Sequence, residues 1–268
     1  MDYQNNGNGS HFGNENDQTP QQYEQTAANA AAATSLMQHS GIGALSNQIA
    51  ENFEPATAEN AITDQRYNIT IGVMLLYGFL VNAIMCFVFE DGIIGFVSDI
   101  HPLLFFIGYM VAVLIGTLIC AYSKSAVGCF AGYNLIVLPM GLMITPLINL
   151  YQVGTVRYAF TVLCVMTMVM IGLAVAFQNF FISIGRMLMA CFLIAFVGML
   201  VLFAFNVDLG PFDYIFVGIF SLFIGYDWAV AQRVPKTTQN AIRSASMLYV
   251  DMINLLIRLL RILAKNRD

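Results

Sequence analysis

Charged side chains are scarce in this chain of 268 residues. Lys, Arg, Asp and Glu together make up 10% of it, whereas a soluble globular domain typically carries about 25%. Hydrophobic residues make up 58%, and the mean hydropathy is +0.70. Most of the surface therefore cannot face water, which excludes an ordinary soluble domain. A nucleic-acid-binding protein is excluded as well, because it would need a basic face.

Histidine is scarce, and the three that occur, His11, His39 and His101, are too scattered to predict a metal site. The five cysteines include no CxxC pair, so we expect them to act as small apolar packing residues. The P-loop, GxSxG and HExxH motifs are also absent. We therefore expect neither an enzyme nor a resident cofactor.

The chain divides at about residue 66. Residues 1–66 are rich in Asn, Gln, Gly, Ser and Ala, a composition that predicts a disordered polar N-terminal tail. Residues 67–268 predict an all-α transmembrane domain, because they contain repeated runs of about 20 mostly apolar residues. We expect seven spans, at 68–90, 102–122, 127–150, 156–177, 181–205, 213–231 and 243–263.

The basic residues predict how these spans are oriented. Lys and Arg in short loops favour the cytoplasmic side, and their distribution places the N-terminus inside. Seven spans would then put the basic C-terminus, from Arg258 to Arg267, outside. The alternative is a last segment that enters the membrane and returns to the cytoplasm. We expect seven full spans.

Two acidic residues lie deep inside the last two apolar segments. Asp227 follows Tyr226 in the sixth, and Asp251 follows Val250 in the seventh. Residues equidistant from the turn of an antiparallel hairpin lie level, and both positions are 12 residues from position 239. Each carboxylate should therefore lie roughly 12 Å inside the cytoplasmic boundary. Ionisable groups at membrane depth are costly, so this pair is our candidate functional site.

Two carboxylates this close in a low dielectric cannot both ionise cheaply, so we expect them to share one proton and to act as a pH sensor. Loss of that proton would leave two like charges that separate or capture a cation. Calcium, which takes oxygen ligands, is the natural guest. Asn254, one turn after Asp251, could add an amide oxygen. In the structural alternative, each aspartate caps a helix or pairs with a nearby arginine, such as Arg233 for Asp227.

The C-terminal third also carries a longer pattern. Tyr226-Asp227 is followed by a basic, polar linker, then by the run 247–256 (MLYVDMINLL) and by the ending 259–263 (LLRIL). This spacing resembles the C-terminal signature of the transmembrane Bax inhibitor motif family, and the layout of residues 68–263 is similar to that family throughout. We identify the chain as a bacterial-type member.

The resemblance implies a bundle of seven transmembrane helices with the C-terminal helix near its centre. It also implies a calcium leak governed by an aspartate pair, which matches Asp227 and Asp251. Some members use an arginine after the second segment to hold the first aspartate, and here only Lys124 could replace it. Tyr249, in the signature beside Asp251, is a further supporting candidate. Bacterial members lie in the inner membrane, which is the location we expect, and some interact with a membrane protease.

These observations predict a pH-sensitive, calcium-permeable leak channel, with the lipid bilayer and a transient calcium ion as its partners. A proton-coupled transporter using the same carboxylates is one alternative. A regulatory protein acting on a membrane protease or cell-death factor is another. An intramembrane aspartyl protease is disfavoured, because its second aspartate follows Gly-x-Gly and Asp251 follows Leu248-Tyr249-Val250.

Overall fold

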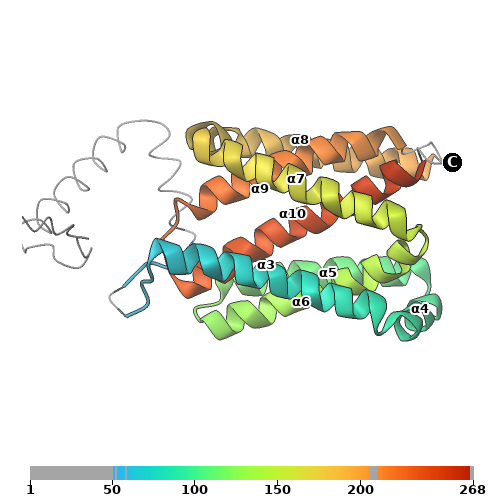
Figure 1. The fold of residues 1–268 in the computed structure, drawn as a ribbon, viewed down its shortest axis with the longest axis horizontal. Coiled ribbons are helices and arrows are strands. Elements are labelled where there is room, and N and C mark those ends of the chain that lie inside the picture. The colour runs from blue at the N-terminus through green and yellow to red at the C-terminus, as the bar shows by residue number, and fades with distance from the viewer. Residues whose placement is uncertain (1–50, 52, 58, 206–209, 266–268) are drawn as a thin grey trace, which may run out of the picture. The chain divides into compact units, whose positions relative to one another are not determined.

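The computed structural model describes residues 51, 53–57, 59–205 and 210–265. The expected all-α architecture is confirmed in this part of the chain, where all the secondary-structure elements are helices (Figure 1). Their bounds are α3 (Asp64–Phe87), α4 (Glu90–Ser98), α5 (Pro102–Tyr122), α6 (Ala126–Asn149), α7 (Val153–Ala176), α8 (Gln178–Ala204), α9 (Gly210–Ala231) and α10 (Thr238–Lys265).

Local sequence accounts for several helix starts. Thr63 and Ser125 precede α3 and α6, and their hydroxyls accept hydrogen bonds from the backbone N–H groups of Arg66 (3.3 Å) and Gly128 (3.1 Å). A side-chain oxygen at this position satisfies a donor that the helix itself leaves unpaired. At α5, proline at the first helical position also favours the start of the helix, because its φ is already helical. The local sequence thus accounts for where these three helices begin.

The first apolar segment, expected to run to residue 90, ends at Phe87, and the short helix α4 follows it. Glu90 and Asp91 form the first turn of α4, where the helix dipole favours negative charge. These acidic residues therefore begin a new helix instead of ending the preceding one.

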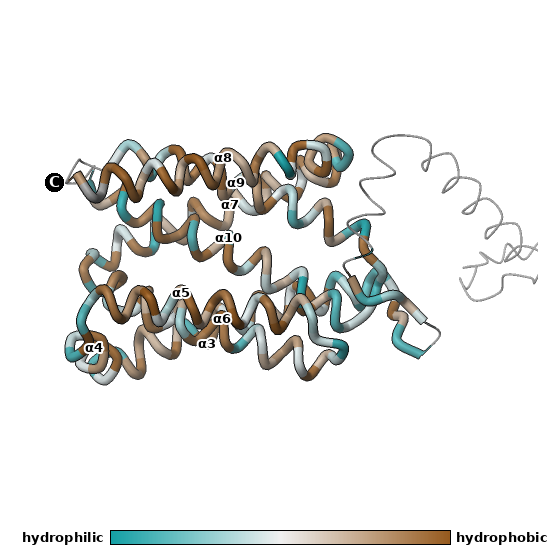
Figure 2. Tube along the Cα trace, turned by 180° about the vertical axis from the view of Figure 1, so that it is seen from behind, coloured by the Kyte–Doolittle hydropathy of each residue, from teal (hydrophilic) through white to brown (hydrophobic). Residues whose placement is uncertain are grey.

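Among the described residues, six helices, α3 and α5 to α9, are long and apolar enough to cross a membrane. Large apolar side chains are exposed on several of them, including Leu76 (69%), Leu104 (65%) and Ile194 (74%), and hydrophobic residues run along most of their length (Figure 2). Exposed apolar surface on this scale fits contact with lipid. The helix α10 is less apolar, and the count of seven spans remains a prediction.

The helix α10 runs diagonally between two groups of helices (Figure 1), and it contacts α3, α5, α6, α7 and α9. Most of its apolar residues are buried, among them Leu248, Leu255, Leu256 and Leu260. Because protein surrounds so much of α10, its polar residues can meet other side chains instead of lipid.

The segment before α3 contacts the bundle at the α9–α10 connection. Phe53 is 8% exposed, Ala61 pairs with Thr237 in an isolated antiparallel bridge, and the Ile62 N–H donates to the Lys236 carbonyl (2.9 Å). Contacts with the bundle therefore begin before residue 67, the expected domain boundary. The rest of the predicted tail, residues 1–50, lies outside the described residues, as do Asp208 and Arg267.

Candidate functional site

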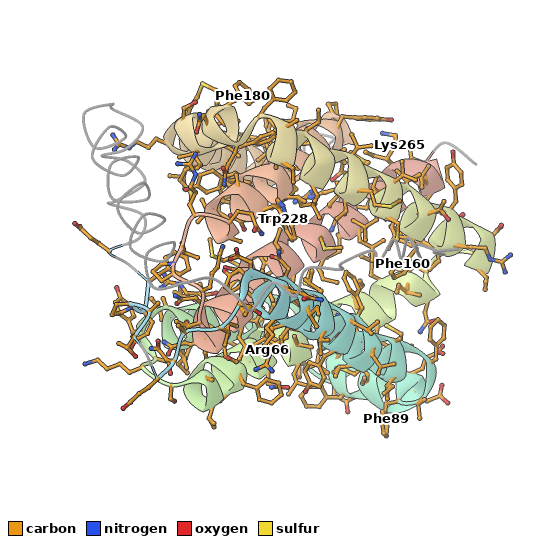
Figure 3. The ribbon with its side chains drawn as sticks, turned by 60° about the vertical axis from the view of Figure 1, so that its left-hand side comes forward. Arg66, Phe89, Phe160, Phe180, Trp228 and Lys265 are labelled. Atoms are coloured by element: carbon orange, nitrogen blue, oxygen red, sulfur yellow. The ribbon has the colours of Figure 1, made fainter. Side chains whose placement is uncertain are left out.

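Asp227 lies in the last turns of α9 and is 7% exposed. Aromatic and small residues surround this part of the helix. A Cβ on Gly225 would meet the Phe181 ring of α8 at 2.3 Å, and a Cβ on Gly185 would meet the Tyr226 ring at 2.3 Å. The helices α8 and α9 therefore approach closely beside Asp227. Trp228, which follows Asp227, is half-buried, whereas Phe89 and Phe180 are exposed at the periphery of the bundle (Figure 3).

Asp251 lies near the middle of α10 and is 8% exposed. Its side chain forms a hydrogen bond with the side chain of Asp227. Its Oδ2 atom is buried and has no hydrogen-bond partner among the described residues. Two carboxyl groups can hydrogen-bond to each other only when at least one of them holds a proton, since two ionised carboxylates are acceptors only. The structure thus brings the two aspartates together.

The connection between these helices differs from the symmetric hairpin of the sequence argument. Asp227 is close to the end of α9, whereas Asp251 is far from the start of α10. The non-helical segment from Gln232 to Thr237 connects the two ends and includes Pro235. Counting residues from position 239 nevertheless pairs the two aspartates that meet in the fold.

Neither aspartate forms an ion pair with a described lysine or arginine. The ion pairs of the described chain join Asp213 to Arg258 and Arg261. Arg233, the expected alternative partner of Asp227, donates instead to the Asn179 side chain of α8 (2.6 Å). The pair is therefore a contact between two acids without a neighbouring cation.

The supporting candidates lie elsewhere. The amide of Asn254 donates to the Val250 carbonyl of its own helix (2.8 Å), and Lys124 is exposed in the α5–α6 connection. The Tyr249 hydroxyl accepts a hydrogen bond from Asn82 of α3, and its ring packs edge-on against Tyr133 of α6 (centroids 5.6 Å apart). Tyr249 therefore joins α10 to α3 and α6.

A cavity of about 440 Å³ lies near the pair. Tyr226, next to Asp227, lines it together with Met247, one turn before Asp251, and Phe53, Tyr122 and Arg243. The Arg243 guanidinium lies over the Phe53 ring, 4.1 Å from its centroid, and donates to the Ala121 carbonyl (3.2 Å). Glu51 lines the same cavity, so the cavity carries one acidic and one basic side chain.

Residues near the other ends of α9 and α10 also meet. Arg258 donates to Asp213 at 2.7 Å and lies over the Phe216 ring, 4.5 Å from its centroid. Arg261 lies 3.8 Å from the same carboxylate. Asp213 is in the first turn of α9, where the helix dipole also favours an anion. The ion pairs of this cluster therefore link α9 to α10.

The sequence analysis predicted neither the cavity with its Phe53–Arg243 contact nor the ionic cluster at Asp213. The counting argument that paired Asp227 with Asp251 pairs position 213 with position 265, one turn beyond Arg261, so it would have placed Asp213 only near the basic end of α10. Phe53 is a large aromatic residue in an otherwise polar stretch, a weak sign that this stretch packs. Its contact with Arg243 joins residues too distant in sequence for any local pattern to predict.

The comparison with protein families bears on the whole helical part of the chain. Residues 60–268 match the model of the family described as inhibitor of apoptosis-promoting Bax1. No curated protein matches the chain. Since the matched region covers all the described helices, the chain is a multi-pass membrane protein that belongs to this Bax inhibitor-like family.

Proposed function

We propose that the chain is a pH-sensitive, calcium-permeable leak channel controlled by Asp227 and Asp251. The observation that carries this proposal is the hydrogen-bonded contact of two buried carboxyl groups without a described cationic partner. One carboxyl lies in α10, the helix that contacts α3, α5, α6, α7 and α9. A change at this contact can therefore reach most of the bundle.

The shared proton is the switch. While it is bound, the two carboxyl groups join α9 to α10 through a hydrogen bond. When it leaves, two negative charges remain at close range. Two unit charges about 4 Å apart repel by about 4 kcal/mol at an effective dielectric constant of 20, which exceeds the roughly 1 kcal/mol of a typical hydrogen bond. The helices then separate locally, or a cation enters between the carboxylates.

Calcium in this proposal passes through and does not reside. It prefers six to eight oxygen ligands, and no group of three or more His, Cys, Asp or Glu side chains in the described residues is arranged to hold a metal ion. Two carboxylates with water as the remaining ligands suit brief occupancy. The unpartnered Oδ2 of Asp251 is the atom we assign to the first contact.

The arrangement described above corresponds to the closed state. Arg243 lies at the cavity near one end of the α9–α10 contact, and Arg258 lies near the other. Arg243 shares the cavity lining with Glu51, Arg258 forms an ion pair with Asp213, and both guanidinium groups bridge elements of the closed bundle. We include α10 as the seventh span, because its charged residues at 251 and 258 meet protein groups rather than lipid.

Calcium flux into liposomes that hold the purified protein tests the proposal. Flux through the wild type should depend on pH between roughly 6 and 8, a range in which buried carboxyl groups are known to titrate. Asp227→Asn and Asp251→Asn remove the titration while keeping side-chain size. Each should abolish the pH dependence, whatever flux remains, and the double variant should resemble the single ones, since coupled residues are not additive.

Lys124→Ala is the matched control. It removes a charge from an exposed position in the α5–α6 connection and should leave the pH profile unchanged. If Asp251→Asn kept the wild-type profile, the proposal would be wrong. Flux that required a proton gradient across the liposome, and not merely a given pH, would favour the proton-coupled transporter.

A further inference from the structure

Two cysteines face each other at one end of the bundle. Cys120 is in the last turn of α5 and Cys129 in the first turn of α6. The Cys120 thiol donates to the Cys129 carbonyl (Sγ to O, 2.9 Å), and the Cys129 thiol donates to the Cys120 carbonyl (3.7 Å). Both residues are buried, and their side chains also contact one another. Each sulfur therefore already reaches the backbone of the opposite residue.

The helices that carry these cysteines are in backbone contact. A Cβ on Gly132 would lie 2.8 Å from the Gly116 carbonyl oxygen and 2.9 Å from the Cys120 nitrogen. A disulfide requires Cβ atoms roughly 3.5–4.5 Å apart and Cα atoms within about 6.8 Å. The close helices supply the backbone approach, and rotation about the Cα–Cβ bonds then turns the two sulfurs toward one another.

The helix α10 adds a cation near this pair. The Arg243 guanidinium donates to the carbonyl of Ala121, the residue after Cys120 (3.2 Å). A cation beside a thiol stabilises the thiolate, which is the form that reacts with oxidants. Arg243 and Ala121 also line the cavity of about 440 Å³, which is far larger than the roughly 30 Å³ that one water molecule occupies. A peroxide molecule of similar size can enter it.

We propose that Cys120 and Cys129 form an oxidation site at which hydrogen peroxide produces an intramolecular disulfide between α5 and α6. The Cys120 thiolate attacks one peroxide oxygen, the O–O bond breaks, and the departing hydroxide takes up a proton to become water. The Cys129 thiol, after losing its proton, attacks the sulfur of the resulting sulfenic acid, the S–O bond breaks, and a second water forms. Two thiols lose two electrons and two protons, and a dithiol reductant reverses the change.

This site lies where α10 begins. The Gln239 side chain donates to the Ser123 carbonyl in the α5–α6 connection, and Arg243 donates to Ala121 in α5. A disulfide draws the Cys120 sulfur toward the Cys129 sulfur and away from the Cys129 carbonyl to which its thiol donates. Oxidation therefore changes the surface on which the first turns of α10 pack. The inference stands independently of the aspartate pair.

The test uses the full-length protein in detergent, treated with hydrogen peroxide. After unfolding, free thiols are alkylated and the protein is digested without reduction for mass spectrometry. Two alkylatable thiols should be lost, a peptide linking Cys120 to Cys129 should be found, and dithiothreitol should restore both thiols. Cys120→Ser or Cys129→Ser should abolish the linked peptide.

Cys86→Ser is the matched control, because Cys86 is equally buried but its thiol contacts Thr145 (3.4 Å). It should leave the disulfide unchanged. Cys164 and Cys191 lie on exposed faces of α7 and α8, and replacing both with serine in every variant prevents links between molecules. The proposal fails if Cys120 and Cys129 stay alkylatable after peroxide treatment. It also fails if Cys120 proceeds to a sulfinic acid with Cys129 still free.

Discussion

Removing Arg258 should destabilise the fold more than removing any exposed base. Its guanidinium donates to Asp213 at 2.7 Å, and the two side chains are 15% and 12% exposed. Breaking a buried pair by deleting one partner typically costs about 3–5 kcal/mol, since the other charge stays buried without compensation. Arg261 remains 3.8 Å from Asp213 and offsets part of this loss. We expect Arg258→Met to lower the free energy of unfolding by about 2–4 kcal/mol.

The double variant separates the contribution of the ion pair from that of the other contacts of the two side chains. Asp213→Asn combined with Arg258→Met removes both charges, so most of the loss should be recovered, with a remainder of about 1 kcal/mol from the lost Arg258–Phe216 contact. The single variant Asp213→Asn should also be destabilised, because it leaves Arg258 buried without its partner, so the loss in the double variant should be well below the sum of the two single losses. Reversible unfolding in mixed detergent micelles, followed by circular dichroism, measures each variant.

Arg261→Met is the matched control. Its side chain is 41% exposed and its distance to Asp213 is longer, so the loss should not exceed about 1 kcal/mol. Equal losses for Arg258→Met and Arg261→Met, or additive effects in the double variant, would refute the reasoning that burial makes this pair strong.

Three further predictions concern packing, the N-terminal segment and topology. Gly132→Val should lower the free energy of unfolding by about 1–3 kcal/mol, because the new Cβ would meet the Gly116 carbonyl. Gly172 has open space around it, so Gly172→Val should change the free energy of unfolding little. A deletion ending at residue 60 should be less stable than one ending at residue 50 by about 2–4 kcal/mol, since it removes the buried Phe53 ring; equal thermal midpoints would contradict this. A cysteine added after Asp268 should react with a membrane-impermeant maleimide from the side opposite the N-terminus, and labelling on the same side would favour a re-entrant last helix.

Local patterns in the sequence determined the secondary structure and its apolar character. The runs that begin near residues 68, 102 and 127 became α3, α5 and α6 with small shifts at their ends. Hydrophobicity, helix caps and loop length are properties of neighbouring residues, so a single sequence contains them. Counting residues about position 239 likewise paired Asp227 with Asp251, whereas the depth of the two carboxyl groups in the membrane remains a prediction.

Only the tertiary structure decided which polar groups meet. Tyr249 and Asp251 are two residues apart on α10, yet one contacts Asn82 and the other Asp227, because successive helical residues point about 100° apart around the axis. Which residue each side chain contacts depends on how α3, α6 and α9 pack around α10. The contact of Phe53 with Arg243 likewise joins residues far apart in the chain. Such contacts result from the packing of whole helices, and no local pattern encodes them.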